Sequence, residues 1–228
     1  VFTSSEWAGQ PFIADPWQDV IVRNFFGWKR PDGFRRYHTL FLLVPRKNGK
    51  TELTAAILCY IFFILTEAGG QIFSAAADRE QAALVYDAVQ AMIEANPKLI
   101  ARCKIYKTFK SIQHNSVRQM YKVLPGDRKG KLGKNAMAYT MDELLEQQDR
   151  DLMDALDTSM ANKEEPITIM MTTHDYARPS VCNEKVAYAR GVRDGLIDDP
   201  GFLPVLYESV ASEGEPADWW KSPQEWAR

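Results

Sequence analysis

The stretch TLFLLVPRKNGKT, residues 39–51, decides the fold. Its first part, residues 39–44, is a continuous apolar run, which is typical of a strand buried on both faces of a parallel sheet. Residues 45–49 break that run. From Lys50 to about Glu67 the chain is apolar on nearly all sides, which predicts a buried helix ended by the glycines at positions 69 and 70. This strand, loop and helix form the first unit of an α/β domain.

The same alternation continues along the chain. Strand patterns occur at residues 71–76, 136–141, 167–172 and 202–207, and helical patterns at residues 12–28, 78–95, 149–160 and 181–194. Between them, residues 104–124 alternate apolar and polar side chains, which predicts antiparallel strands with turns near Lys110 and Asn115. The expected fold is therefore α/β, with a mainly parallel central sheet, flanking helices and some added antiparallel strands. Such sheets bind ligands beyond the carboxyl ends of their strands.

Composition narrows the class of protein. The chain has 228 residues, of which 46% are hydrophobic and 25% charged, values that suit a globular chain and exclude a disordered one. Three widely spaced cysteines exclude a disulfide scaffold, and the three scattered histidines argue against a histidine-based metal site. The longest apolar stretch, residues 53–65, is shorter than the ~20 residues that span a bilayer. We therefore expect no membrane association.

Residues 44–51, VPRKNGKT, carry most of a phosphate-binding loop. The general pattern is G-x-x-x-x-G-K-[ST]; Gly49, Lys50 and Thr51 match its end, whereas Val44 replaces its first glycine. In such a loop, N–H groups at the helix N-terminus face phosphate oxygens, the lysine reaches the β- and γ-phosphates, and the threonine hydroxyl binds Mg²⁺. Positive charge and further backbone donors come from the rest of the loop: Arg46, Lys47 and Asn48. The alternative is a basic turn without a ligand.

Two more strand ends carry polar side chains suited to the same chemistry. Asp142 and Glu143 follow a buried strand as in a Walker B motif, where the first carboxylate faces Mg²⁺ and the second polarises the attacking water. The alternative is an acidic region that caps the next helix. Thr172 and Thr173 end another buried strand, where their hydroxyls either face the γ-phosphate or simply terminate the strand. With the loop before it, the acidic pair predicts a site for Mg-ATP.

Trp17 and Gln18 precede the first buried strand. A glutamine amide offers both a donor and an acceptor to an adenine edge, and an aromatic ring can stack on the base. The alternative is an N-terminal helix that packs on the core.

The charge distribution indicates a possible polyanion contact. Residues 98–134 contain eleven Lys and Arg but only one acidic residue, Asp127, in a chain whose net charge is −2. This segment is either a surface for a polyanion such as DNA or a solvated face.

Together, residues 11–28, the loop at 44–51, the sequence DELLEQQ at 142–148 and the threonine pair at 172–173 resemble the ATPase domain of phage terminase large subunits, in particular the HK97-like branch. The resemblance covers nearly the whole chain. It implies a P-loop NTPase fold of the ASCE (RecA-like) type for residues 1–210. Residues 211–228 would begin a linker toward a C-terminal nuclease domain that this chain lacks.

The resemblance also implies a role for each matching residue. These are an adenine motif at Trp17 and Gln18, Walker A at Arg46, Lys47, Asn48, Gly49, Lys50 and Thr51, Walker B at Asp142, the catalytic glutamate at Glu143, and a coupling motif at Thr172, Thr173 and His174. Many relatives have Thr-Thr-Ala-Gly at the last motif, so His174 and Asp175 depart from the pattern.

A ring motor is expected to supply a cationic residue in trans, because charge develops on the γ-phosphoryl group during transfer. Arg128 is the first candidate, followed by Lys129 and Lys131, and the alternative is a DNA-facing or solvated loop.

The implied function is a DNA-packaging motor that uses ATP and Mg²⁺ to move double-stranded DNA into a procapsid. Its implied partners are further copies of itself in a ring, the small terminase subunit and the portal protein, in the host cytoplasm. Two other readings remain open. A helicase-like translocase would carry a second RecA-like domain, and a non-hydrolysing nucleotide switch would suit Val44 in place of glycine.

Overall fold

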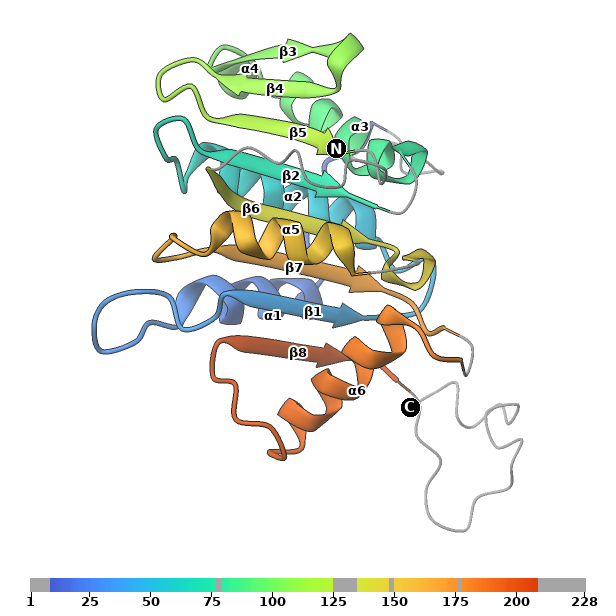
Figure 1. Ribbon diagram of the computed structural model, residues 1–228. Helices are drawn as coiled ribbons and strands as arrows, with labels where there is room; N and C mark the ends of the chain where they lie inside the picture. Colours follow the sequence, from blue (N-terminus) through green and yellow to red (C-terminus); the bar gives the residue numbers. More distant parts are fainter. Residues whose placement is uncertain (1–8, 77–78, 125–134, 148–149, 176–177, 209–228) are drawn as a thin grey trace.

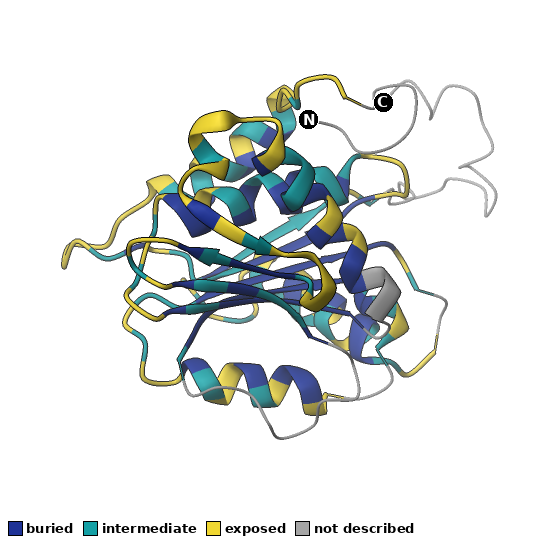
Figure 2. Ribbon diagram, turned by 90° about the horizontal axis from the view of Figure 1, so that it is seen from above, coloured by how far each residue is buried: buried dark blue, intermediate teal, exposed yellow. Residues whose placement is uncertain are grey.

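The computed structural model describes residues 9–76, 79–124, 135–147, 150–175 and 178–208. Within them, one eight-stranded sheet has the order β3-β4-β5-β2-β6-β7-β1-β8, with helices on both faces (Figures 1 and 2). The strands are β1 (Thr39–Leu43), β2 (Gln71–Ala75), β3 (Cys103–Tyr106), β4 (Ser111–His114), β5 (Met120–Leu124), β6 (Ala136–Asp142), β7 (Ile167–Thr172) and β8 (Phe202–Leu206). The helices are α1 (Pro16–Gly27), α2 (Lys50–Phe63), α3 (Arg79–Glu94), α4 (Pro97–Ile100), α5 (Asp151–Met160) and α6 (Val181–Arg193), with 3₁₀ turns η2 (Lys107–Phe109) and η3 (Leu144–Glu146).

The strands from β5 to β8 in this order pair in parallel, whereas β3 and β4 add an antiparallel extension beside β5. This confirms the expected α/β fold with a mainly parallel sheet. Because parallel strands all end at the same edge, the loops after β1, β6 and β7 are neighbours there. Strand β7 lies between β1 and β6, so it separates the phosphate-loop strand from the strand that ends in the acidic pair.

The core lies on both faces of the sheet. Along β1, Leu40 and Leu42 join the cluster beneath α1, α2 and α3, whereas Phe41 and Leu43 join the cluster beneath α5 and α6. This alternation follows from the two-residue period of a strand, and each fully buried side chain of this size contributes roughly 1.5–3 kcal/mol. The sheet is therefore fixed from both sides, which holds its carboxyl edge in place.

Helix α1 begins later than its apolar pattern. The pattern starts near residue 12, but Asp15 is the N-cap and Pro16 takes the first helical position, where its missing N–H is harmless. The Asp15 N–H donates to Oε1 of Gln18 at 3.0 Å, as in a capping box.

The expected end of the second helix near Glu67 is wrong. Helix α2 ends at Phe63, and the following residues form the turn into β2. Gly69, with φ +68°, donates its N–H to the carbonyl of Val117 at 2.9 Å. A side chain at Gly70 would come within 2.8 Å of the Met137 sulfur. The chain must therefore leave the helix early to pass close beside β6.

The segment at residues 104–124 forms antiparallel strands as expected. Lys110 adopts a left-handed conformation between η2 and β4, and Asn115 follows β4 directly. The patterning did not reveal that β5 also pairs in parallel with β2, which joins the extension to the main sheet. No helix among the described residues is long and apolar enough to cross a membrane.

Candidate active site

The loop between β1 and α2 closes onto the N-terminus of a 14-residue helix. Gly49 is the N-cap of α2 and has φ +67°, and Lys47 has φ +68°, so the loop contains two left-handed positions. The Asn48 amide donates to the carbonyls of Pro45 at 3.1 Å and Arg46 at 3.3 Å. These contacts hold the loop at a helix end where N–H groups without intrahelical partners and the helix dipole both favour an anion.

Lys50 turns inward from this loop. Only 7% of Lys50 is exposed, and its Nζ lies 3.8 Å from Oε1 of Glu143. Burial lowers the pKa of Lys50, and the charges of Glu143 and Asp142 oppose that change. The structure thus brings the phosphate loop and the acidic pair together at one edge of the sheet.

Asp142 and Glu143 occupy the end of β6. Asp142 is 5% exposed, and burial, with a further contribution from the Glu143 charge, raises its pKa to about 6. Glu143 has φ +50°, an unusual conformation for a residue with a side chain, and its N–H donates to Oδ1 of Asp142 at 3.1 Å. Oε2 of Glu143 is buried without a hydrogen-bond partner among the described residues. Strain and an unsatisfied carboxylate oxygen at one position are features that cluster at functional sites.

The end of β7 lies between the end of β1, where the phosphate loop begins, and the end of β6, which carries the acidic pair. Its register places Thr172 beside Leu43 of β1 and Met171 beside Asp142 of β6. Thr172 donates its hydroxyl to the carbonyl of Thr173 at 3.0 Å, whereas the buried Oγ1 of Thr173 has no partner within the described part of the chain. The Thr173 hydroxyl is thus free to bind a ligand at this edge.

The arrangement suits a magnesium ion bound together with phosphate. Thr51 lies in the first turn of α2, and Asp142 faces Lys50 across the same edge. Hydroxyl and carboxylate oxygens are ligands that Mg²⁺ prefers, and Mg²⁺ is usually held by one or two carboxylates with water and phosphate. The described residues contain no group of three or more His, Cys, Asp or Glu side chains that could hold a metal ion. Burial is the main cause of the raised pKa of Asp142, and a bound cation would lower that pKa again.

Gln18 lies beside the phosphate loop, and Trp17 precedes it on α1. Gln18 is 3% exposed, and its Nε2 is 3.5 Å from the position that a Cβ on Gly49 would occupy. The Trp17 ring meets the ring of Tyr207 edge-on, with 5.4 Å between centroids. Gln18 therefore caps α1 through its oxygen while its amide nitrogen faces the loop, so helix packing and proximity to the site occur together.

Several residues at this edge had no assigned role in the sequence interpretation. Arg178 donates to the carbonyl of Leu145 at 3.3 Å and so connects the approach to α6 with η3. Gln147 has a buried Nε2 without a partner among the described residues. The motif DELLEQQ contains Gln147 but gives no sign that its amide would be buried. Arg128, Lys129 and Lys131 lie outside the described residues.

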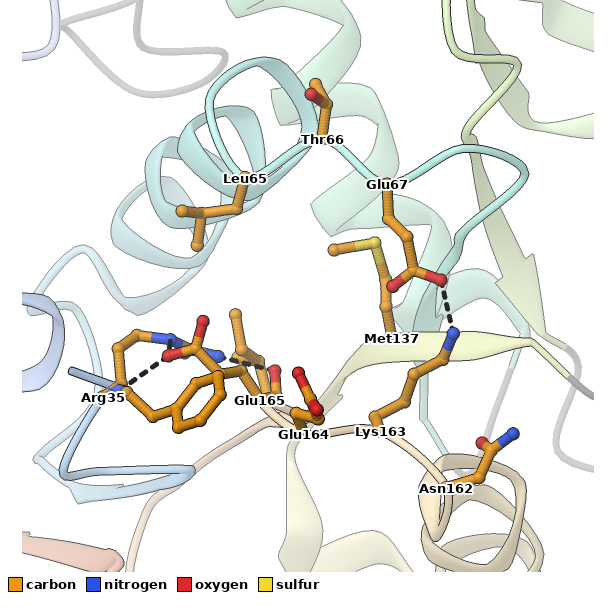
Figure 3. A pocket seen from close by; sticks show the side chains of 11 residues that line it. Arg35, Leu65, Thr66, Glu67, Met137, Asn162, Lys163, Glu164 and Glu165 are labelled. Atoms are coloured by element: carbon orange, nitrogen blue, oxygen red, sulfur yellow. Dashed lines mark hydrogen bonds and ion pairs between the residues drawn. The ribbon is translucent and has the colours of Figure 1, made fainter. Parts of the chain in front are cut away.

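A separate pocket of about 440 Å³ lies at the opposite edge of the sheet, near the start of β6 and β7 (Figure 3). Arg35 donates to the side chain and the carbonyl of Glu165, and Lys163 pairs with Glu67. Its charged groups thus largely satisfy one another. Since this pocket lies far from the ends of the parallel strands, it has no part in the site around Lys50.

Known proteins with related sequence and structure match most of this chain. A family model described as terminase large subunit, ATPase domain, matches residues 16–191. The large terminase subunit of Enterobacteria phage HK97 is 31% identical over 169 residues, which cover 72% of this chain and 32% of that protein. The crystal structure of the HK97 large terminase has a TM-score of 0.75 at 27% identity, covering 91% of this chain and 42% of that chain.

A more distant structure shares the fold. The large terminase of the thermophilic bacteriophage D6E, in complex with ADP, has a TM-score of 0.50 at 11% identity and covers 80% of this chain and 43% of that chain. The present chain spans about a third of the curated HK97 relative. The match over residues 16–191 contains the phosphate loop, the acidic pair and the threonine strand end described above. The chain therefore belongs to the family of terminase large-subunit ATPase domains, with a P-loop NTPase fold.

Proposed function

We propose that this chain hydrolyses ATP with Mg²⁺ and that, within a longer protein, it drives double-stranded DNA into a viral procapsid. The observation that carries the proposal is the contact between Lys50 of the phosphate loop and Glu143 of the acidic pair, residues that lie far apart in the sequence. Family membership supports ATP hydrolysis, and the ADP complex of the D6E terminase supports nucleotide binding at this fold.

Each side chain at the edge has a task in this proposal. Lys50 and the N–H groups at the start of α2 hold the phosphates, and Arg46 adds charge beside them. Thr51 and Asp142 would hold Mg²⁺, which would supply positive charge to neutralise the phosphate oxygens. Glu143 accepts a proton from the attacking water through Oε2, the oxygen that lacks a hydrogen-bond partner within the described residues. Thr173, which lies between the phosphate loop and the acidic pair, contacts the γ-phosphate.

The base-binding part of the proposal involves α1. Gln18 would use its amide nitrogen, which is not used in the cap, as a donor to adenine, and Trp17 would pack against the base. Arg128 would complete the site of a neighbouring subunit in a ring. The small terminase subunit, the portal protein and a location in the host cytoplasm are part of the same proposal.

The test is hydrolysis by a Glu143→Gln variant of the full-length protein with DNA. We expect the rate to fall by about 10²–10⁴-fold, the usual contribution of a general base, while Mg-ATP binding is kept. Glu146→Gln is the matched control, because Glu146 is an exposed acid in η3 three residues away. Steady-state phosphate release would measure both variants. An unchanged rate for Glu143→Gln would remove Glu143 as the base.

The structure gives the non-hydrolysing alternative little support. Val44 favoured it in sequence, but Val44 is 5% exposed and donates its N–H to the carbonyl of Thr172 at 3.2 Å. It therefore extends β1 into the core and leaves the turn around Gly49 unchanged. The helicase-like alternative is not favoured either, since the family match is to terminases.

DNA contact is proposed for part of the basic segment. Lys107 and Lys110 pair with Glu94 and Asp87 of α3, each at 3.0 Å, so their charges are partly neutralised. Lys104, on β3 at the edge of the sheet, is exposed and has no carboxylate within 4.0 Å among the described residues. Such exposed lysines are suited to phosphate backbone contacts, which depend strongly on salt.

This contact can be tested by charge reversal at exposed lysines. We expect Lys98→Glu combined with Lys104→Glu to weaken DNA binding and to reduce the slope of log affinity against log salt by about 2. Lys29→Glu, outside the basic segment, is the control. A salt slope equal to that of the unchanged protein would assign these lysines to solvent or to subunit contacts.

A further inference from the structure

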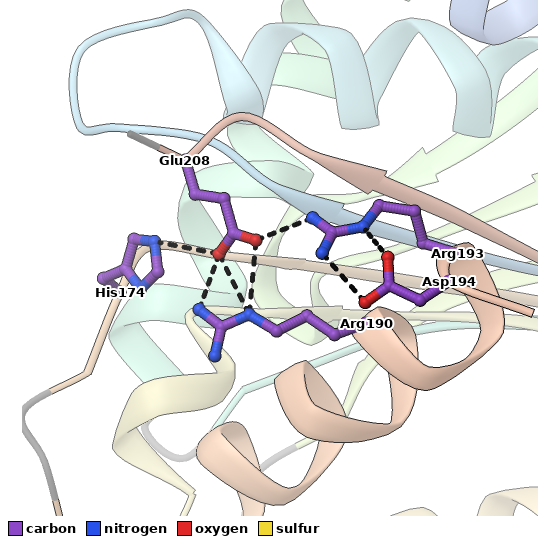
Figure 4. Close-up of polar contacts among 5 residues, drawn as sticks. All are labelled: His174, Arg190, Arg193, Asp194 and Glu208. Carbon is purple, nitrogen blue, oxygen red and sulfur yellow. Dashed lines mark hydrogen bonds and ion pairs between the residues drawn. The ribbon is translucent and has the colours of Figure 1, made fainter. Parts of the chain in front are cut away.

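Glu208 is a buried carboxylate just beyond β8 (Figure 4). Its side chain is 5% exposed and accepts hydrogen bonds from two arginines in the last turn of α6. Nη2 of Arg190 donates at 2.6 Å and Nη1 of Arg193 at 2.8 Å, one to each carboxylate oxygen. These charge-assisted bonds lower the pKa of Glu208, so the carboxylate is ionised at neutral pH.

The same carboxylate reaches the coupling motif. Nε2 of His174 lies 3.7 Å from Oε2 of Glu208, although the two residues follow different strands. His174 comes after β7 and Glu208 comes after β8, and β1 lies between those strands in the sheet. The contact therefore passes over the carboxyl end of β1, where the phosphate loop leaves the sheet.

Hydrogen bonds lie on both sides of the contact between His174 and Glu208. Tyr207 donates its N–H to the carbonyl of Leu43, the last residue of β1, at 2.8 Å. On the far side of His174, Ser180 donates its hydroxyl to Asp175 at 2.8 Å. The chain after β7 thus lies close to Glu208 on one side and is hydrogen-bonded to the start of α6 on the other.

We propose that Glu208 is a positioning residue for ATP hydrolysis, which holds His174, and with it Thr173, in place over the end of β1. The proposal rests on the hydrolytic function proposed above. Thr173 directly precedes His174, and its buried hydroxyl has no partner among the described residues, so its position depends on the path of the chain after β7. Glu208 itself is assigned no contact with nucleotide.

The first test compares Glu208→Gln with Asp194→Asn in the full-length protein with DNA. Asp194 accepts a hydrogen bond from Arg193 at 2.7 Å, but it is exposed and does not contact His174. The substitution Asp194→Asn therefore removes a carboxylate from the same cluster and leaves the contact between His174 and Glu208 in place. For Glu208→Gln we expect kcat to fall by about 10-fold, since small misplacements at a reacting centre are costly. The dissociation constant for Mg-ATP should stay within about twofold of the original, and Asp194→Asn should leave kcat unchanged.

A double-mutant cycle separates positioning from a general loss of stability. His174→Gln should lower kcat about as much as Glu208→Gln, and the double variant should show no further loss, because both break one contact. The proposal would be overturned if the fall in kcat of the double variant equalled the product of the two single falls, or if Glu208→Gln left kcat unchanged. If Glu208→Gln does not fold, His174→Gln alone decides, since it leaves the arginine–glutamate bonds intact and an unchanged kcat there refutes the role.

A second measurement does not depend on activity. Amide hydrogen exchange over residues 168–175 of the nucleotide-free protein should be faster in Glu208→Gln and unchanged in Asp194→Asn. Equal protection in all three proteins would show that Glu208 does not hold this strand end. If the unchanged protein releases no phosphate, the proposed hydrolysis fails, whereas the exchange result still tests the anchoring by Glu208.

Discussion

Replacing Asp142 with asparagine should stabilise the nucleotide-free domain while impairing its chemistry. Asp142 is 5% exposed at the end of β6, and its burial raises its pKa to about 6 from the ordinary value of 3.8. The ionised carboxylate is therefore unfavourable in the folded protein until a cation compensates it. Asparagine has nearly the same shape and carries no charge, so it removes this cost.

The magnitude follows from the two pKa values. Their difference corresponds to a penalty of about 3 kcal/mol at about 1.36 kcal/mol per pKa unit. The attraction of Lys50 for the Asp142 carboxylate is already included in the pKa of about 6, so the substitution does not lose it a second time. We therefore expect the free energy of unfolding to rise by about 1–3 kcal/mol at pH 7.5.

The pKa of Asp142 also determines how the stability gained by the substitution changes with pH. Below the unfolded-state pKa the carboxyl is protonated in both states and costs nothing. Between that value and about 6 the folded protein holds the proton more tightly than the unfolded chain, so stability falls as pH rises. Above about 6 the whole penalty is present. The gain from Asp142→Asn should consequently be roughly half as large at pH 5.0 as at pH 7.5.

Urea denaturation at pH 5.0 and 7.5, with chelator and without nucleotide, measures these differences. Asp198→Asn is the control, because Asp198 is an exposed aspartate beyond α6. Asp142→Asn should also lose Mg-dependent phosphate release. The reasoning is refuted if the variant is no more stable than the original protein at pH 7.5, or if its gain is the same at both pH values.

Three further substitutions test the rest of the site. Lys50→Met should raise the dissociation constant of Mg-ATP by about 10–100-fold in calorimetric titration, because charge-assisted bonds are worth about 1.5–3 kcal/mol; an unchanged constant would separate Lys50 from the phosphates. Gly49→Ala and Gly33→Ala should each lower the free energy of unfolding, measured in urea, by about 1–2 kcal/mol, because both glycines have positive φ. Only Gly49→Ala should also weaken nucleotide binding. Trp17→Ala should weaken ATP binding by about 10-fold in a fluorescence titration, because stacking on the base is lost. Trp28→Ala, at an exposed tryptophan, should leave ATP binding intact. Equal effects of the two substitutions would argue against a base contact of Trp17.

The strand ends could be predicted from sequence because a strand buried on both faces is a continuous apolar run. The polar residues that interrupt such a run, as at Asp142 and Thr172, must lie at the ligand-binding edge. Lys50 was predictable for the same reason, since its loop lies between such a strand and a buried helix. The α/β fold follows from these features, the family was identified by its resemblance to known motifs, and the comparisons confirm both.

Other parts of the site depend on strand order, which local patterns do not contain. Glu208 meets His174 only because β8 and β7 lie on either side of β1. The left-handed conformation of Glu143 was equally hidden, because glutamate rarely adopts it and only the tight 3₁₀ turn after β6 requires it. The end of α2 was predicted too late because apolar residues continue past Phe63 into a loop that packs beside β6.

Helix α2 is buried by the sheet beneath it and by α3 beside it, and most of its side chains are enclosed. A helix held in this way has little freedom to tilt or slide when phosphate arrives at its first turn. In the function proposed above, movement that follows hydrolysis would then leave the domain through the connections after β6, β7 and β8. Substitutions meant to change the size of the movement in the proposed motor should therefore be made in those three connections, whereas α2 should be kept as the fixed element.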